Sequence, residues 1–284
     1  MTEQAQIRRI RVGDRTLGPG PVLVGILNVT PDSFSDGGDH PDPEAAARRA
    51  AAMLDEGAHI LDVGGESTRP GSEPVSPGEE LDRVIPVIRR ILEERPDAVI
   101  SVDTYRSATA GAALEAGAAL VNDVTALRGD PDMAKVVAEA GCPVVLMHMQ
   151  GAPETMQEEP RYEDVVREVR EFLAERAAHA ETAGVAPENV ILDPGIGFGK
   201  TLQHNLLLLS DLDAIGRLGY LVLVGASRKS FIGKISGVEE ARYRVSGTLA
   251  TSVLAYERGA TLFRVHDVRA NREALEVAEA ILRS

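Results

Sequence analysis

The chain of 284 residues has no tryptophan and a single cysteine, and aromatic residues make up only 4% of it. We interpret the lone Cys142 as a small buried hydrophobe rather than as a reactive thiol. No window of about 18 apolar residues occurs, so no membrane span is expected. The polar start from Met1 to Arg11 lacks the apolar stretch of a signal peptide, and we expect a cytoplasmic protein.

Basic charge is also scarce, since the net charge is −14. Nucleic acid is therefore not an expected partner, because a phosphate backbone needs a basic face on the protein. A small anionic substrate remains compatible, because a few cations can dominate one pocket. Apolar residues reach 44%, enough for a core of Val, Leu, Ile and Ala, and no low-complexity linker interrupts the chain. We expect one domain over residues 1–284.

Eight short apolar runs that end in polar or charged residues indicate the fold. Segments of helical periodicity separate them, among them residues 43–56, 161–182, 204–215 and 239–257. Eight strand–helix units in about 250 residues predict a (β/α)8 TIM barrel, an α/β fold with a buried parallel sheet. Weak alternation over residues 7–18 predicts a short N-terminal hairpin that plugs the barrel, within residues 1–18. The runs are Val22–Leu27, Ile60–Leu61, Val99–Val102, Ala118–Val121, Val144–Met147, Val190–Leu192, Leu221–Val224 and Leu262–Phe263.

The polar residues that follow these runs should meet at one face of the barrel, where active sites of this fold lie. Asp62, Asp103, Asn122 and Asp193 are the main examples. Taken singly, each can be a helix cap or a turn former. Gathered round one cavity, their acceptors and amide donors suit a heterocycle with adjacent N–H and NH2 groups.

Arg264 and His266 end the last strand, a position that often binds phosphate in such barrels. Arg can hold phosphate oxygens with two donors, and His can add another. A purely structural His266 is the alternative. Asn28, with oxygen ligands from the loop that follows it, can hold Mg²⁺ against a diphosphate. No His and Cys spacing typical of structural zinc occurs.

Two long polar loops, Asn28–Gly38 and Gly64–Ser72, are predicted to cover the same face. Each carries a bulky residue, Phe34 or Arg69, among small ones, which favours lids over plain connectors.

The glycine-rich segment Asp193–Thr201 fails the phosphate-loop pattern, because Pro194 stands where the first Gly is required. We expect its glycines to let the backbone approach a flat ligand, with Phe198 offering a ring.

The chain resembles the dihydropteroate synthase family in segments that follow the family's order through nearly the whole sequence. Only about the first dozen residues lie outside the resemblance. It implies condensation of 6-hydroxymethyl-7,8-dihydropterin diphosphate with 4-aminobenzoate to 7,8-dihydropteroate and diphosphate, in folate biosynthesis. We hypothesise an SN1-like path, in which diphosphate leaves first. The matching segments are Gly25–Gly38, Asp62–Gly71, Ser101–Tyr105, Asn122–Asp123, Asp193–Lys200, Ser227–Phe231 and Arg264–Asp267.

The resemblance also implies residue roles. By similarity, the pterin is bound by Asp103, Asn122, Asp193 and Lys229. The diphosphate is held by Asn28, Arg264 and His266, with Mg²⁺ at Asn28. The 4-aminobenzoate site is shaped by Phe34, Thr68, Arg69, Pro70, Phe198 and Ser230. The expected catalytic set is Asp103, Asp193, Lys229, Arg264 and His266.

Two other functions remain open, a pterin-binding methyltransferase domain and a non-catalytic pterin-binding protein. The first gives no reason for Ser227–Ser230 or for the Arg264 and His266 pair. The second is disfavoured by the retention of every expected diphosphate ligand. Small and apolar residues all round Ser246–Tyr256 predict a homodimer through the C-terminal helices, with packing on the last helix alone as the alternative.

Overall fold

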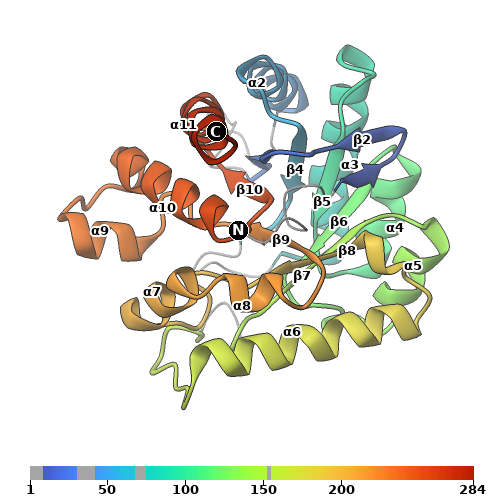
Figure 1. Cartoon of the computed structure of the whole chain (residues 1–284). Helices are drawn as coiled ribbons and strands as arrows, with labels where there is room; N and C mark the ends of the chain where they lie inside the picture. Colours follow the sequence, from blue (N-terminus) through green and yellow to red (C-terminus); the bar gives the residue numbers. More distant parts are fainter. Residues whose placement is uncertain (1–8, 31–41, 68–74, 152–154) are drawn as a thin grey trace.

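The computed structural model describes residues 9–30, 42–67, 75–151 and 155–284 (Figure 1). Within them, eight parallel strands pair in chain order, and β10 pairs with both β9 and β3, which closes the barrel. The predicted (β/α)8 fold is confirmed. The strands are β3 (Val22–Asn28), β4 (Ile60–Gly64), β5 (Ile100–Asp103), β6 (Leu120–Asp123), β7 (Val144–Met147), β8 (Val190–Asp193), β9 (Leu221–Val224) and β10 (Leu262–Val265).

The predicted N-terminal hairpin is also confirmed. Strands β1 (Ile10–Val12) and β2 (Arg15–Leu17) pair antiparallel. Ile10, Val12 and Leu17 are buried in one apolar cluster with residues from the starts of the barrel strands, such as Leu120 and Leu262. The hairpin therefore closes the amino-terminal end of the barrel, and the opposite end is left for a site.

Helices cover the outside of the barrel, and local sequence signals explain where several of them begin and end. Helix α2 (Pro43–Glu56) begins after Asp42, whose carboxylate accepts the Glu44 N–H at 2.9 Å, and ends at Gly57 with φ 106°. The other helices are α3 (Pro77–Glu94), α4 (Ser107–Glu115), α5 (Met133–Ala140), α6 (Val165–Thr182), α7 (Leu202–Ser210), α8 (Asp213–Gly216), α9 (Ser230–Ser236), α10 (Val245–Glu257) and α11 (Val268–Leu282).

Three predicted helix ranges were wrong at their ends. The helix expected over 161–182 begins at Val165, because the Asp164 carboxylate caps it by accepting the Arg167 N–H. The range 204–215 holds two helices, α7 and α8. The range 239–257 begins as helix only at Val245, and the short α9 before it was not predicted. Gly237, with φ 74°, ends α9 within two turns, too short for a periodic pattern.

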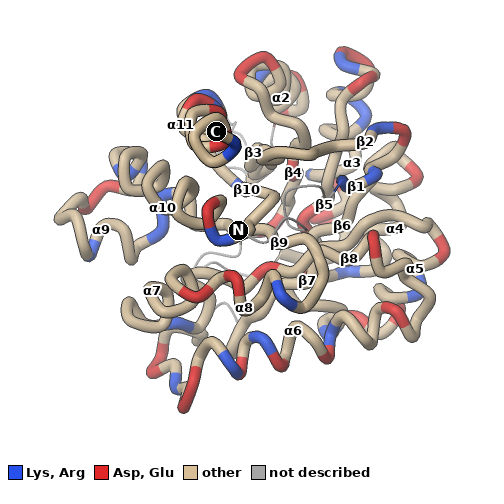
Figure 2. Tube along the Cα trace, in the orientation of Figure 1, with Lys and Arg blue, Asp and Glu red and all other residues tan. Residues whose placement is uncertain are grey.

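The outer surface carries charges of both signs. Figure 2 shows Lys and Arg interspersed with Asp and Glu along the outer helices, for example on α6. No helix in the described part of the chain has the length and apolarity required to cross a membrane.

The hairpin plug should contribute measurably to stability. We predict that Ile10→Ala, which removes a side chain only 2% exposed, lowers the free energy of unfolding by about 2–5 kcal/mol. Its neighbour Arg11 is exposed, so Arg11→Ala is the matched control and should change stability by less than about 0.5 kcal/mol. Urea unfolding of both variants checks this. Equal stability of the two would show that the hairpin is not part of the core.

Candidate active site

The carboxyl-terminal end of the barrel gathers the polar residues expected there. The strand register places Asn28 opposite Gly64, Gly64 opposite Asp103, and Asp103 opposite Asn122, so these positions lie level round the rim. Asp193 ends β8, and Arg264 is the penultimate residue of β10. Residues that are far apart in the sequence therefore share one mouth, as predicted.

Arg264 on β10 forms two ion pairs at this mouth, one with Asp62 on β4 and one with Asp103 on β5. Its Nε donates to Asp62 Oδ2 at 2.6 Å, and one terminal nitrogen donates to Asp103 Oδ2 at 2.7 Å. The Asn122 amide donates to the same Asp62 oxygen at 3.0 Å. Asp62, Asp103 and Asn122 are all buried. A guanidinium has five N–H donors, so Arg264 keeps donors for a further anion.

Asp103 is poised to change charge near neutral pH. Burial raises the pKa of this carboxyl to about 7; Arg264 works against the rise, and the negative charge of Asp62 adds to it. Once Asp103 is ionised, two carboxylates face one guanidinium, and their net negative charge can stabilise a developing cation.

Asp193 and Lys229 form the other charged part of the mouth. Burial raises the pKa of Asp193, whose Oδ1 accepts the Gly195 N–H at 2.7 Å. Burial lowers the pKa of Lys229 to about 7, although the nearby Asp193 charge opposes this. The Lys229 ammonium lies 4.2 Å from the centre of the Phe198 ring and donates to the Ile196 carbonyl.

A strained turn presents Lys229 to the mouth, and sequence reasoning missed it. Arg228 has φ 60°, which is unfavourable for a side chain of this size. Its guanidinium binds both carboxylate oxygens of Asp267, with Nε to Oδ2 at 2.9 Å, and its N–H donates to Thr248 Oγ1 at 3.0 Å. These contacts hold the strained conformation, so the direction of the next residue is fixed.

The glycines after Asp193 pack closely on the protein's own backbone. A Cβ on Gly195 would lie 1.9 Å from the His148 carbonyl oxygen, and one on Gly199 would lie 2.3 Å from the Gln150 carbonyl oxygen. In the described residues these glycines therefore let the loop pack on the backbone that follows β7. The expected approach of this backbone to a flat ligand stays a prediction. The close packing places Phe198 beside Lys229.

Lys200 fixes the same loop to the residues that follow β7. This buried ammonium contacts His148 Nδ1 at 2.9 Å and donates to the Phe198 carbonyl at 3.0 Å. Burial lowers the pKa of Lys200 to about 7 and that of His148 to about 3, so His148 is neutral and accepts at Nδ1. In the sequence, a lysine after three glycines was the signal for a special role of Lys200, but nothing identified His148 as its partner.

The remaining expected residues divide into two groups. Asn28 is half-buried at the end of β3, Ser230 is exposed at the start of α9, and His266 Nδ1 lies 3.0 Å from Ser227 Oγ. Phe34, Thr68, Arg69 and Pro70 lie outside the described residues.

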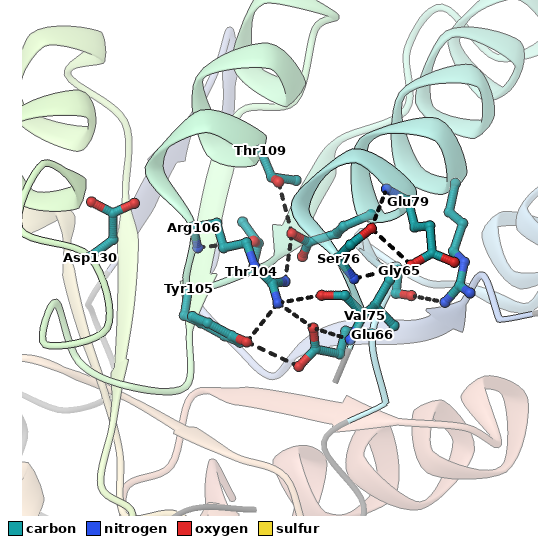
Figure 3. A network of polar contacts seen from close by, with 12 residues as sticks. Gly65, Glu66, Val75, Ser76, Glu79, Thr104, Tyr105, Arg106, Thr109 and Asp130 are labelled. Atoms are coloured by element: carbon teal, nitrogen blue, oxygen red, sulfur yellow. Dashed lines mark hydrogen bonds and ion pairs between the residues drawn. The ribbon is translucent and has the colours of Figure 1, made fainter. Parts of the chain in front are cut away.

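A network centred on Arg106 connects Glu66 and Val75, which lie on either side of residues 68–74 (Figure 3). Its guanidinium binds Glu66 at 2.7 Å, the Val75 carbonyl at 2.7 Å and Glu80 at 2.9 Å. Glu80 on α3 is buried and also accepts from Thr109 on α4 at 2.8 Å. The network fixes the chain on either side of that segment to α3 and α4.

Comparison with known proteins agrees with this fold. The family model described as pterin binding enzyme matches residues 24–266. The dihydropteroate synthase of Synechocystis sp. is 47% identical over 266 residues, which cover 94% of this chain and 92% of the relative. That of Escherichia coli is 49% identical over 262 residues, which cover 92% of each chain.

Solved structures are similar over almost the full length. A Xanthomonas albilineans dihydropteroate synthase with 4-aminobenzoic acid has a TM-score of 0.91 and 46% identity, covering 98% of this chain and 99% of that one. A structure from the same organism in complex with 7,8-dihydropteroate has a TM-score of 0.88 and 44% identity, covering 97% and 99% of the two chains.

Fold and site thus define the class, an α/β barrel enzyme with its charged groups at the carboxyl-terminal mouth. The chain belongs to the pterin-binding enzyme family, and within that family to the dihydropteroate synthases.

The raised pKa of Asp103 leads to a pH prediction. Because this carboxyl stays protonated up to pH about 7, a reaction that needs the carboxylate should speed up as the pH rises through that value. We predict that Asp103→Asn lowers kcat at least tenfold and removes this acid limb from the profile of kcat/KM. Steady-state rates measured from about pH 5 to about pH 9, on both sides of that pKa, provide the measurement. If the variant keeps the acid limb of the wild-type protein, that limb comes from a group other than Asp103.

Proposed function

We propose that this protein condenses 6-hydroxymethyl-7,8-dihydropterin diphosphate with 4-aminobenzoate, and releases 7,8-dihydropteroate and diphosphate. The main support is the gathering of Asp103, Asp193, Lys229 and Arg264 at one mouth, where they offer carboxylates to a heterocycle and cations to a diphosphate. Relatives solved with 4-aminobenzoic acid and with 7,8-dihydropteroate add to it. These ligands favour the synthase over a methyltransferase domain or a non-catalytic binder.

Pterin binding is assigned to buried acceptors and donors. Asp193 uses one oxygen for the Gly195 N–H, so its second oxygen can accept from the ring N–H and amino groups of the pterin. Asn122 and Lys229 supply donors to the carbonyl oxygen and a ring nitrogen of the pterin. Because the mouth is buried, each unpaired ring donor would cost free energy, and this favours a pterin over rings with another pattern.

The bond changes follow from these placements. The bond between the exocyclic methylene carbon and the diphosphate oxygen breaks, and the electron pair leaves with diphosphate. Arg264 and His266 stabilise that departing charge. The carboxylates of Asp103 and Asp193 stabilise the cation left on the methylene, which is delocalised into the dihydropterin. The amine of 4-aminobenzoate then forms the C–N bond and loses a proton to solvent or to diphosphate.

Magnesium fits this site as a partner of the substrate. Among the described residues, no group of three or more His, Cys, Asp or Glu side chains can hold a metal ion. Mg²⁺ commonly binds through one or two protein oxygens and the phosphates of its substrate, and the half-buried Asn28 amide oxygen is such a ligand. When bound, the ion would neutralise diphosphate charge.

The 4-aminobenzoate site is assigned to Phe198 and Ser230 together with Phe34, Thr68, Arg69 and Pro70. Phe198 lies against Lys229 and is half-buried, so its ring can stack on a benzoate next to the pterin site.

Incubation of the protein with both substrates and Mg²⁺ tests the reaction. We expect equimolar diphosphate and 7,8-dihydropteroate, and neither when one substrate is omitted. A large ¹³C isotope effect at the methylene carbon together with a strong dependence on the amine would contradict the SN1-like order. Absence of any product would refute the proposed reaction itself.

We also propose a homodimer through the C-terminal helices. A groove of about 440 Å³ between α7, α9 and α10 is lined mainly by apolar side chains, including Leu206, Leu209 and Phe231. Ile235 and Leu254, which also line the groove, are 59% and 50% exposed. A contiguous apolar surface of this kind is typical of a protein–protein interface, and a second copy is the partner favoured by the sequence.

The single-domain organisation and the cytoplasmic location stay predictions.

Light scattering checks the dimer. We predict a mass twice the 30.3 kDa of one chain at micromolar concentration, and a monomer for Leu254→Glu, because a buried unpaired charge would oppose association. Ala178→Glu on the exposed side of α6 is the matched control and should remain dimeric. A monomeric wild-type protein would contradict the proposal.

A further inference from the structure

Asp62 occupies the junction between the expected diphosphate ligand and an expected pterin ligand. Its Oδ2 accepts from Arg264 Nε at 2.6 Å and from the Asn122 amide at 3.0 Å. The Asp62 side chain is fully buried, whereas Arg264 is 20% exposed toward the mouth. Asp62 therefore cannot reach a ligand at the surface of the mouth, but it contacts two residues that can.

Stability alone does not account for a carboxylate at this position. Its second oxygen, Oδ1, is buried and has no hydrogen-bond partner in the described part of the protein. Asp62 and Ser101 line the same small cavity inside the barrel, and Ser101 Oγ also has no partner among the described residues. A buried charge with one oxygen unpaired costs free energy, and well-packed apolar residues would often be at least as stable. Retaining a carboxylate here is more readily explained by what it holds in place.

Without Asp62, the side chains it contacts would lose their orientation. Arg264 would keep Asp103 as its ion partner at 2.7 Å, so its guanidinium could swing about that single contact. Asn122 would be left without the acceptor of its amide, since Asp62 is the side chain to which the structure shows it donating. A guanidinium that holds a diphosphate needs a fixed plane to present its donors in pairs.

We propose that Asp62 is a positioning residue that fixes Arg264 for the diphosphate and Asn122 for the pterin without touching either. This inference rests on the proposed function and adds a residue to which the resemblance assigned no role. The acidic groups that face the Arg264–Asp103 pair are Asp62 on β4, Asp193 on β8, Asp123 on β6 and Glu80 on α3, and the Lys229 ammonium also interacts with Arg264. Asp62 and Asp103 are the two of these that bind Arg264 directly.

Two substitutions separate hydrogen bonding from charge. Asp62→Asn keeps an oxygen acceptor for Arg264 and Asn122 and removes the negative charge, whereas Asp62→Ala removes both. Because the Asp62 charge helps to raise the pKa of Asp103, its loss should lower that pKa. The acid limb of kcat/KM should then move to lower pH in Asp62→Asn.

Steady-state kinetics and calorimetry with inorganic diphosphate and Mg²⁺, on the full chain, test the proposal. For Asp62→Ala we expect a KM for the pterin diphosphate at least tenfold higher, weaker diphosphate binding by a similar factor, and a KM for 4-aminobenzoate within twofold of wild type. Asp62→Asn should keep both KM values within about threefold and show the shifted acid limb. Glu80→Gln is the matched control for the KM of the pterin diphosphate and for diphosphate binding, since it removes a buried carboxylate near Asp103 that contacts neither Arg264 nor Asn122. It is not a control for the acid limb, because the Glu80 charge also raises the pKa of Asp103.

The outcomes that overturn the proposal are specific. A folded Asp62→Ala that binds diphosphate as the wild type does would overturn it, as would an Asp62→Asn as impaired as Asp62→Ala. If Asp62→Ala fails to fold, a folded Asp62→Asn whose KM for the pterin diphosphate is at least tenfold higher than that of the wild type overturns it. A wild-type protein that forms no dihydropteroate would refute the proposed function, whereas the calorimetry would still decide the role of Asp62.

Discussion

The guanidinium of Arg264 is the interaction on which the mouth of the barrel depends. It binds Asp62 and Asp103, which are 202 and 161 residues away in the sequence, so its contacts form only when the last strand closes the barrel. Breaking a buried ion pair by removing one partner typically costs about 3–5 kcal/mol, because the other charge stays buried. The closure of the fold and the assembly of the site are therefore the same event, and neither is achieved by any local segment.

Buried charges of opposite sign also organise the other side of the mouth, but there the basic groups outnumber the acidic one. There Lys229 and Lys200 surround the Asp193 end of β8, and the glycine loop packs on the backbone after β7. On one side two carboxylates face one guanidinium, and on the other two ammonium groups face one carboxylate. A pterin can lie between them with its developing positive charge near Asp103 and Asp193 and its diphosphate near Arg264 and His266.

The sequence allowed the barrel to be predicted because its signals are local. Apolar runs of strand length, the Asp42 cap before Pro43 and the alternating hairpin each depend on neighbouring residues. Partners were harder to predict. Glu80 is a charged residue on the core side of α3, paired with Arg106 26 residues later, and Lys200 pairs with His148 52 residues earlier. Periodicity indicates which way a side chain faces, but not which distant group it meets.

Burial is what makes this mouth reactive near neutral pH. Burial raises the pKa of Asp103 and lowers that of Lys229, and both reach about 7 from opposite sides. An acid and a base with such values exchange protons easily with each other and with solvent, so a substrate with its own charges can set their final state. An arriving diphosphate favours the charged ammonium, and a cationic methylene favours the charged carboxylate. A site whose Asp103 and Lys229 titrate near pH 7 can take up its charges when a substrate arrives, which avoids the larger cost of burying every group ionised in the free protein.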